Sequence, residues 1–145
     1  MSESKYDVLK LENQLCFPLY AAAREVVKRY RPHLDALDLT YTQYITMMVM
    51  WEQKNITVKA LGEKLFLDSG TITPVVKSLE AKGYIIRKRS TTDERSVNVL
   101  LTDTGEKLKD AACEIPAKVA GCVGLEPGEA VRLYELLYKI LSVQE

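Results

Sequence analysis

Apolar residues recur at three- and four-residue spacing along most of this chain, a period typical of amphipathic helices. The first such stretch predicts a long helix over residues 9–31. Pro18 should kink this helix because proline removes the backbone bond to Gln14. Pro32 should close it, since a helix rarely continues through proline, and a short helix over His33–Leu37 is expected to follow.

Two more helices are expected in the middle of the chain. Thr40 precedes a stretch that is apolar nearly all round, so it should cap a buried helix from Tyr41 to Gln53. Thr57 should cap the next short helix, in which Val58, Leu61 and Leu65 share one side.

A further helix is predicted to begin at residues 69–71 and to run to Lys82. Its buried stripe follows the i, i+3, i+4, i+7 rule and consists of Ile72, Val75, Val76 and Leu79. Pro74 favours this start because proline is best tolerated in a first turn. Gly83 stands where a left-handed residue commonly ends a helix.

The pattern then changes to short strands over residues 84–89 and 97–101, joined by the polar turn Ser90–Ser96. Asp103 with Glu106 has the spacing of a capping box and predicts a long helix to about Gly121. After breaks at Gly124, Pro127 and Gly128, a last helix carries Val131, Leu133, Leu136, Leu137, Ile140 and Leu141.

This order of elements predicts a mainly α fold with a small β-hairpin wing, that is, a winged helix-turn-helix. At 145 residues the chain suits a single domain, 1–145. Residues of about 54–101 would form the DNA-binding part.

Charge is neutral overall but unevenly placed. Residues 54–95 hold nine Lys and Arg against five Asp and Glu, whereas the remaining residues hold eleven against fifteen. A basic working face on an acidic body is typical of a nucleic-acid-binding protein. Any one of these basic segments, taken alone, would be explained equally well as a solvent-exposed charged surface with no DNA-binding role.

Within the basic region the predicted 69–82 helix would enter the major groove, and the hairpin would flank it. Its outward face would present Ser69, Thr71, Thr73 and Lys77, while Arg87, Lys88 and Arg89 on the first strand would neutralise phosphates. Arg95 at the hairpin tip could reach a minor groove, with Asp93 holding its guanidinium.

The remaining composition narrows the class of protein. Three cysteines, Cys16, Cys113 and Cys122, lie in predicted helices without CxxC spacing, so neither a disulfide framework nor a zinc site is expected. We expect no metal and no cofactor. No apolar run approaches the ~20 residues that cross a bilayer, and the N-terminus has no signal-peptide core, so we expect a cytoplasmic protein.

Several segments resemble the MarR family of transcriptional regulators. They are residues 65–74, residues 79–85, the wing Arg87–Ser96 with its D-x-R motif, and Leu101–Gly105. Residues 11–25, which contain the sequence LCFPLY around Cys16, and residues 40–44 are similar to the organic-hydroperoxide repressors of that family, the OhrR branch. The resemblance covers essentially the whole chain.

The resemblance implies that Cys16 is a peroxide-sensing cysteine and that Tyr30 and Tyr41 hydrogen-bond its sulfur. It also implies a homodimer through the terminal helices, residues of about 5–35 and 103–145. In that dimer the tyrosines reach Cys16 from the other subunit. The chemistry fits, because phenolic donors and a helix N-terminus favour the reactive thiolate, and attack on peroxide gives a reversible sulfenic acid.

The other two cysteines are less defined. Some OhrR-branch members carry a second cysteine that forms an inter-subunit disulfide, and Cys122 lies about where it would fall. An external small thiol could serve instead. Cys113, midway along its predicted helix, is expected to be buried.

The sequence thus predicts a repressor, not an enzyme, that binds a pseudo-palindromic double-stranded DNA operator as a homodimer and releases it when an organic hydroperoxide oxidises Cys16. One alternative is a MarR-type repressor released by a small phenolic or other ligand, with Cys16 structural. A cysteine peroxidase is a second alternative, but no oriented base or CxxC pair supports it.

Overall fold

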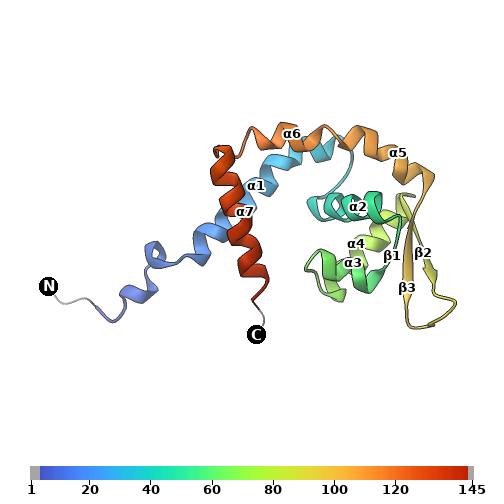
Figure 1. Ribbon diagram of the computed structural model, residues 1–145, viewed down its shortest axis with the longest axis horizontal. Coiled ribbons are helices and arrows are strands. Elements are labelled where there is room, and N and C mark those ends of the chain that lie inside the picture. Colours follow the sequence, from blue (N-terminus) through green and yellow to red (C-terminus); the bar gives the residue numbers. More distant parts are fainter. Residues whose placement is uncertain (1–3, 144–145) are drawn as a thin grey trace.

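A computed structural model describes residues 4–143 of the protein. Figure 1 shows an elongated molecule in which the β2–β3 hairpin lies at one end and the N-terminal segment, α1 and α7 lie toward the other. The helices α2, α3 and α4 pack beside the hairpin, and α5 and α6 lead back along the top of the view.

Seven α-helices, two 3₁₀ helices and three strands are present among the described residues. They are η1 (Asp7–Leu9), η2 (Leu11–Asn13), α1 (Cys16–Asp35), α2 (Tyr41–Gln53), β1 (Asn55–Thr57), α3 (Val58–Lys64), α4 (Ser69–Ala81), β2 (Ile85–Arg89), β3 (Val97–Leu101), α5 (Asp103–Ala112), α6 (Ile115–Ala120) and α7 (Pro127–Leu141). The predicted mainly α fold with a hairpin wing is confirmed.

Side-chain caps fix where the central helices begin. Thr40 caps α2 and Thr57 caps α3, as the sequence predicts. Asp68 caps α4 by accepting a 2.9 Å bond from the Thr71 backbone N–H. Gly83 has φ +83°, as expected for a residue that follows a helix end. The start of α4 is therefore set by Asp68, while Pro74 lies in its second turn.

The small sheet has the order β1-β3-β2, and both pairings are antiparallel. β1 was not predicted from the sequence. Its three residues pair with Leu100, Val99 and Asn98 of β3, so this strand closes the hairpin's inner edge against the helices. A three-residue strand has too little alternation to be distinguished from a loop in the sequence.

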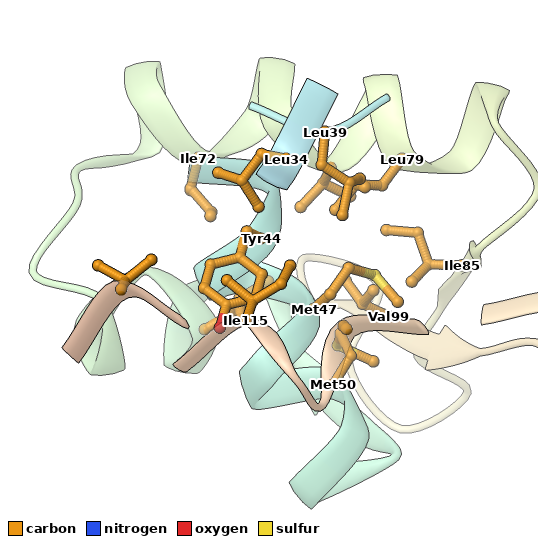
Figure 2. Close-up of a cluster of buried hydrophobic side chains, with 14 residues drawn as sticks. Leu34, Leu39, Tyr44, Met47, Met50, Ile72, Leu79, Ile85, Val99 and Ile115 are labelled. Carbon is orange, nitrogen blue, oxygen red and sulfur yellow. The ribbon is translucent and has the colours of Figure 1, made fainter. Parts of the chain in front are cut away.

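The core lies between α2, α4 and the sheet. Figure 2 shows Met47 and Met50 of α2 beside Ile85 and Val99 of the two long strands, with Leu79 of α4 facing them. All five side chains are fully buried. The apolar stripe predicted for α4 thus packs inward and fixes which side of that helix remains exposed.

The N-terminal helix begins later than predicted, at Cys16 and not at residue 9. Upstream, the side-chain amides of Asn13 and Gln14 donate to the Asp7 and Val8 carbonyls, which favours 3₁₀ turns over a continuous helix. Pro18 therefore falls in the first turn of α1, where backbone N–H groups have no helical partner to lose, and it causes no break.

Two other boundary predictions are wrong. Pro32 lies inside α1, which continues to Asp35 and absorbs the separate 33–37 helix. The predicted 103–121 helix is divided into α5 and α6 because Pro116 cannot donate to the Ala112 carbonyl.

The predicted capping box at the start of α5 is wrong by one residue. The cap is Thr102, whose hydroxyl accepts the Gly105 N–H at 3.0 Å. Glu106 instead forms an ion pair with Lys54, because α5 begins one residue earlier than the predicted box requires.

The terminal segments differ from the core in their exposure. No residue of η1, η2 or α7 is buried. Among the described residues, eighteen of the twenty-one exposed large hydrophobic side chains lie in residues 6–27 or 125–143. These segments present apolar surface that the single chain does not cover.

Candidate DNA-binding face and sulfur site

The recognition helix α4 presents three of the residues predicted for it, Ser69, Thr71 and Thr73, in its N-terminal half, and Lys77 farther along. Ser69, Thr71 and Lys77 are exposed, and Thr73 is half-buried at the edge of the apolar stripe. The N-terminus of a helix carries partial positive charge and free N–H groups, which suit phosphate. This end of α4 therefore carries small polar side chains and a partial positive charge, both of which suit contact with DNA.

The wing tip is held by bonds within its own turn. The Asp93 carboxylate accepts the Arg95 backbone N–H at 3.0 Å and the Ser96 hydroxyl at 3.4 Å. We expected Asp93 to hold the Arg95 guanidinium, and this expectation is wrong for the free protein. Asp93 shapes the turn, and the Arg95 side chain is left exposed at the tip.

The Arg87 side chain on β2 is paired with a carboxylate. Its Nε and Nη2 donate to Glu80 Oε1 at 3.0 and 2.9 Å, and its backbone N–H donates to Glu80 Oε2 at 2.9 Å. These bonds keep the pKa of Glu80 below its ordinary value, with the side-chain bond as the largest cause. The prediction that Arg87 neutralises phosphates misses this pairing between α4 and β2.

The other strand cations divide between two faces. Successive side chains of a strand point to opposite sides, so Arg89 shares the face of Arg87 while Lys88 lies on the other. Both are exposed, and neither forms an ion pair among the described residues. Lys88 and Arg89 therefore face different parts of any bound duplex.

A groove of about 640 Å³ lies between α3, the N-terminal half of α4 and the wing. Its lining includes Thr73 and Ser69 of α4 together with Arg87, Asp93 and Arg95 of the hairpin. The recognition helix and the wing thus border one continuous depression.

Three tyrosine rings form a cluster where the end of α1 meets the start of α2. The ring centroids of Tyr30 and Tyr41 are 5.1 Å apart, those of Tyr30 and Tyr44 are 5.7 Å apart, and those of Tyr41 and Tyr44 are 6.3 Å apart. The resemblance pointed to Tyr30 and Tyr41. Tyr44 was predicted only as core, although its spacing of three from Tyr41 puts the two on one helix face.

Burial raises the pKa of all three tyrosines, and mutual repulsion among the phenolates adds to the rise at Tyr41 and Tyr44. Each side chain therefore stays a neutral phenol across the physiological pH range. A neutral phenol can donate a hydrogen bond to an anion such as a thiolate.

Cys16 is the first residue of α1 and is exposed. It lies fourteen residues from Tyr30 on the same helix, a separation of about 21 Å at 1.5 Å per residue. The structure thus keeps the sulfur and the tyrosine cluster of one chain at opposite ends of α1.

The other two cysteines are also exposed. Cys113, expected to be buried, follows the last residue of α5, where the helix breaks. Cys122 lies in the turn after α6, and its backbone carbonyl accepts a bond from the Arg29 guanidinium. Arg29 is about 20 Å along α1 from Cys16, so Cys16 and Cys122 of one chain cannot form a disulfide in this conformation.

Across residues 4–143, no group of three or more His, Cys, Asp and Glu side chains could hold a metal ion. None of the helices in that range combines the length and apolar character required to span a bilayer. The fold and its polar recognition helix define a winged-helix DNA-binding protein.

Comparison with known proteins gives the family. The family model described as transcriptional regulator SarA/Rot matches residues 28–112. The organic hydroperoxide resistance transcriptional regulator of Bacillus subtilis (strain 168) is 48% identical over 140 residues, covering 97% of this chain and 95% of that protein. The regulator SarZ of Staphylococcus aureus (strain USA300) is 39% identical over 132 residues, covering 91% and 89%.

Among solved structures, reduced AbfR bound to DNA is 33% identical, with a TM-score of 0.78 over 95% of this chain and 96% of that one. AbfR, a protein of Staphylococcus epidermidis, has also been solved overoxidized on DNA and in a disulfide-formed state. The chain belongs to the MarR-type winged-helix transcriptional regulators, in the organic-hydroperoxide branch. It is a DNA-binding regulator and not an enzyme.

Proposed function

We propose that this protein is a homodimeric repressor that binds a pseudo-palindromic operator when reduced and releases it when an organic hydroperoxide oxidises Cys16. The observation that carries this proposal is the arrangement of α1, with an exposed cysteine at its first residue and a cluster of neutral phenols at its far end. The two ends can meet only between two chains.

The exposed apolar ends supply the dimer surface. Val131, Tyr134 and Ile140 of α7 are each about half exposed or more, as are Leu11 and Leu15 before α1. A water-soluble chain gains free energy by covering such surface, and a second copy offers the same surface in return. Residues of about 5–35 and 103–145 would therefore form the dimerisation helices.

In this dimer the partner's tyrosines would hydrogen-bond the Cys16 sulfur. Phenolic donors stabilise a thiolate, and the N-terminus of α1 adds its partial positive charge at the same atom. The apolar side chains of Leu15, Phe17 and Leu19 beside the cysteine suit an alkyl or aryl hydroperoxide better than hydrogen peroxide.

The chemistry is a two-electron oxidation. The Cys16 thiolate attacks the distal peroxide oxygen, an S–O bond forms, the O–O bond breaks, and the alkoxide takes a proton to leave as an alcohol. A second thiol then attacks the sulfenic acid, an S–S bond forms, and water leaves. Cys122 of the partner, exposed and in a turn, can supply that thiol.

Release of DNA would follow from the loss of the sulfur–tyrosine bonds. The reduced dimer would hold its two α4 helices about 34 Å apart, one turn of DNA. Disulfide formation would shift the helices at the dimer interface, so that α4 no longer meets successive major grooves. Because overoxidized AbfR is solved on DNA, we assign release to the disulfide and not to sulfur oxidation alone.

The test measures affinity for a duplex that the reduced protein selects from a random pool, by fluorescence anisotropy, before and after cumene hydroperoxide. We expect oxidation to weaken binding at least tenfold in the native chain and not in Cys16→Ser. Unchanged affinity of the oxidised native chain would rule the function out. Mass spectrometry should show a dimer cross-linked between Cys16 and Cys122, which Cys122→Ser abolishes.

The groove beside α4 favours one alternative, a repressor released by a small phenolic or other ligand. In that case Cys16 would be structural. Cys16→Ser protein that still releases DNA on inducer treatment would support this alternative against the redox mechanism.

A further inference from the structure

The side-chain amide of Gln43 joins the tyrosine end of α2 to the recognition helix. It is only 7% exposed. Its Oε1 accepts the Thr40 backbone N–H at 2.9 Å and the Lys82 ammonium at 3.1 Å, while its Nε2 donates to the Ser78 hydroxyl at 2.7 Å. The start of α2 and the end of α4 thus meet at one amide.

The first of these bonds belongs to the capping box of α2. The Gln43 backbone N–H donates to the Thr40 hydroxyl at 3.2 Å, and the Gln43 side chain closes the box by accepting the Thr40 N–H. Tyr41, the first residue of α2, lies between the two capping residues. Movement of Tyr41 therefore moves the turn that holds the Gln43 amide.

The other two bonds anchor the C-terminal end of α4. Ser78 lies in the last turn of α4, and Lys82 is the residue that directly follows it. Lys82 also donates to the Asp38 carbonyl in the turn between α1 and α2. Ser69, Thr71 and Thr73 lie toward the opposite end of α4, so this anchor sets the direction in which the helix points.

We propose that Gln43 is the positioning residue through which the state of the Tyr30–Tyr41–Tyr44 cluster reaches the recognition helix. This inference rests on the redox function proposed above. The same amide completes the cap beside Tyr41 and bridges to Ser78 and Lys82. It cannot keep all three bonds if the first turn of α2 moves relative to α4.

The physical reason is the short range of hydrogen bonds inside a protein. A bond of 2.7–3.1 Å weakens steeply when its atoms separate or its angle falls, and a buried amide left without partners is unfavourable. When the first turn of α2 shifts, α4 must therefore follow it or lose its anchor. When α4 follows, the placement of its DNA-facing end changes; without the anchor the shift does not reach α4.

The test compares release ratios, the Kd for operator DNA of the oxidised protein divided by that of the reduced protein. Ser78→Ala removes the acceptor on α4 and leaves the Thr40–Gln43 box intact. Gln43→Met fills the same space but removes the side-chain bond of the box and the bridge to α4. We expect each variant to bind DNA within threefold of the native chain when reduced, and its release ratio to fall at least fivefold.

Thr46→Val is the matched control. Thr46 is also a fully buried polar residue of α2, but its hydroxyl donates at 2.7 Å to the Thr42 carbonyl of its own helix. This control should lower thermal stability and leave the release ratio unchanged.

Two results would overturn the inference. One is a native release ratio in both Ser78→Ala and Gln43→Met; the other is an equal loss of ratio in Thr46→Val, which would mean general loosening. A native chain that does not release DNA on oxidation would instead remove the proposed function, and the role of Gln43 with it. Circular dichroism of each variant separates these results from misfolding.

Discussion

The winged-helix body and the terminal helices are built from similar proportions of apolar residues but differ in what those residues contact. In the body, Met47, Leu61 and Leu79 are fully buried within one chain. In α7 no residue is buried, and Tyr134 and Ile140 are 63% and 51% exposed. The body is therefore complete as a single chain, whereas the ends need another surface.

This difference explains how one protein can read DNA and respond to a chemical signal. A rigid body keeps α4 and the wing in a fixed mutual arrangement. In the proposed dimer, the terminal helices would be covered by the second chain and could change their packing without unfolding the body. The sulfur lies at the first residue of such a terminal helix, where a small chemical change would act on the packing between chains.

The largest expected effect comes from a charge on the exposed face of α7. Ile140→Glu should convert the dimer to a monomer and weaken operator binding by more than about 100-fold, because a monomer contacts one half-site. Size-exclusion chromatography with light scattering gives the oligomeric state, and anisotropy gives the affinity.

The neighbouring substitution Lys139→Glu changes charge on the same helix outside the apolar face and serves as the control. We expect it to remain dimeric. If Ile140→Glu also remained dimeric with native affinity, α7 would not be part of the dimer surface.

The same glycine substitution should have opposite effects in the two regions. A Cβ at Gly105 would lie 2.2 Å from the Tyr84 carbonyl oxygen, and the Gly105 carbonyl also accepts the Trp51 indole N–H. Gly105→Ala should therefore destabilise the fold by about 3 kcal/mol, in the range of overpacked core positions. Urea unfolding measures the change.

At Gly128 of α7 an added Cβ meets nothing within 4 Å. Gly128→Ala should stabilise the protein by about 0.5–1 kcal/mol because alanine loses less backbone freedom in a helix. Equal destabilisation by both variants would contradict the contrast between a closed body and open ends.

Within the body, free and paired cations should differ in their effect on DNA binding. Lys77→Met should weaken binding about tenfold and lower the salt dependence, the slope of log K against log salt, by about 0.9. Arg87→Met should change that slope less, because its guanidinium is already bound to Glu80. Equal slopes for the two variants would mean that Arg87 leaves Glu80 on binding DNA.

The smallest effect concerns pH. Arg87 holds the pKa of Glu80 below its ordinary value of 4.5, so the pair contributes stability above pH 4.5 and loses it as the pH falls through the lower folded value. Glu80→Gln should therefore lose less stability than the native chain over that acidic range, measured by thermal unfolding. Glu94→Gln, exposed at the wing tip, is the control and should keep the native pH dependence.

Sequence patterns predicted correctly those features that depend only on the residues within one helix or strand. The apolar stripe of α4, the caps at Thr40 and Thr57, and the two long strands depend on local spacing and were predicted. The boundaries of α1 and the division at Pro116 were not, because they depend on competition between local bonds. Side chains such as Asn13 and Gln14 decide that competition.

The residues of the candidate site likewise include some that the sequence predicts and some that it does not. Residues on the outer face of α4 follow from its stripe, and the sulfur–tyrosine set came from the family resemblance. The Arg87–Glu80 pair and the Gln43 bridge join segments that the sequence separates by 7 and 35 residues. A single sequence carries no signal for such contacts, because the residue type does not show whether an amide is buried or which group it contacts.

In the proposed mechanism, the chemical state of the Cys16 sulfur sets the distance between the two recognition helices of the dimer. Double electron–electron resonance measures that separation directly, with spin labels that do not attach to cysteine placed at Lys64 of α3 in both subunits. We expect one distance in the reduced dimer and a shift of several Å after hydroperoxide treatment, absent in Cys16→Ser. Identical distances in the reduced and oxidised native dimers would contradict the claim.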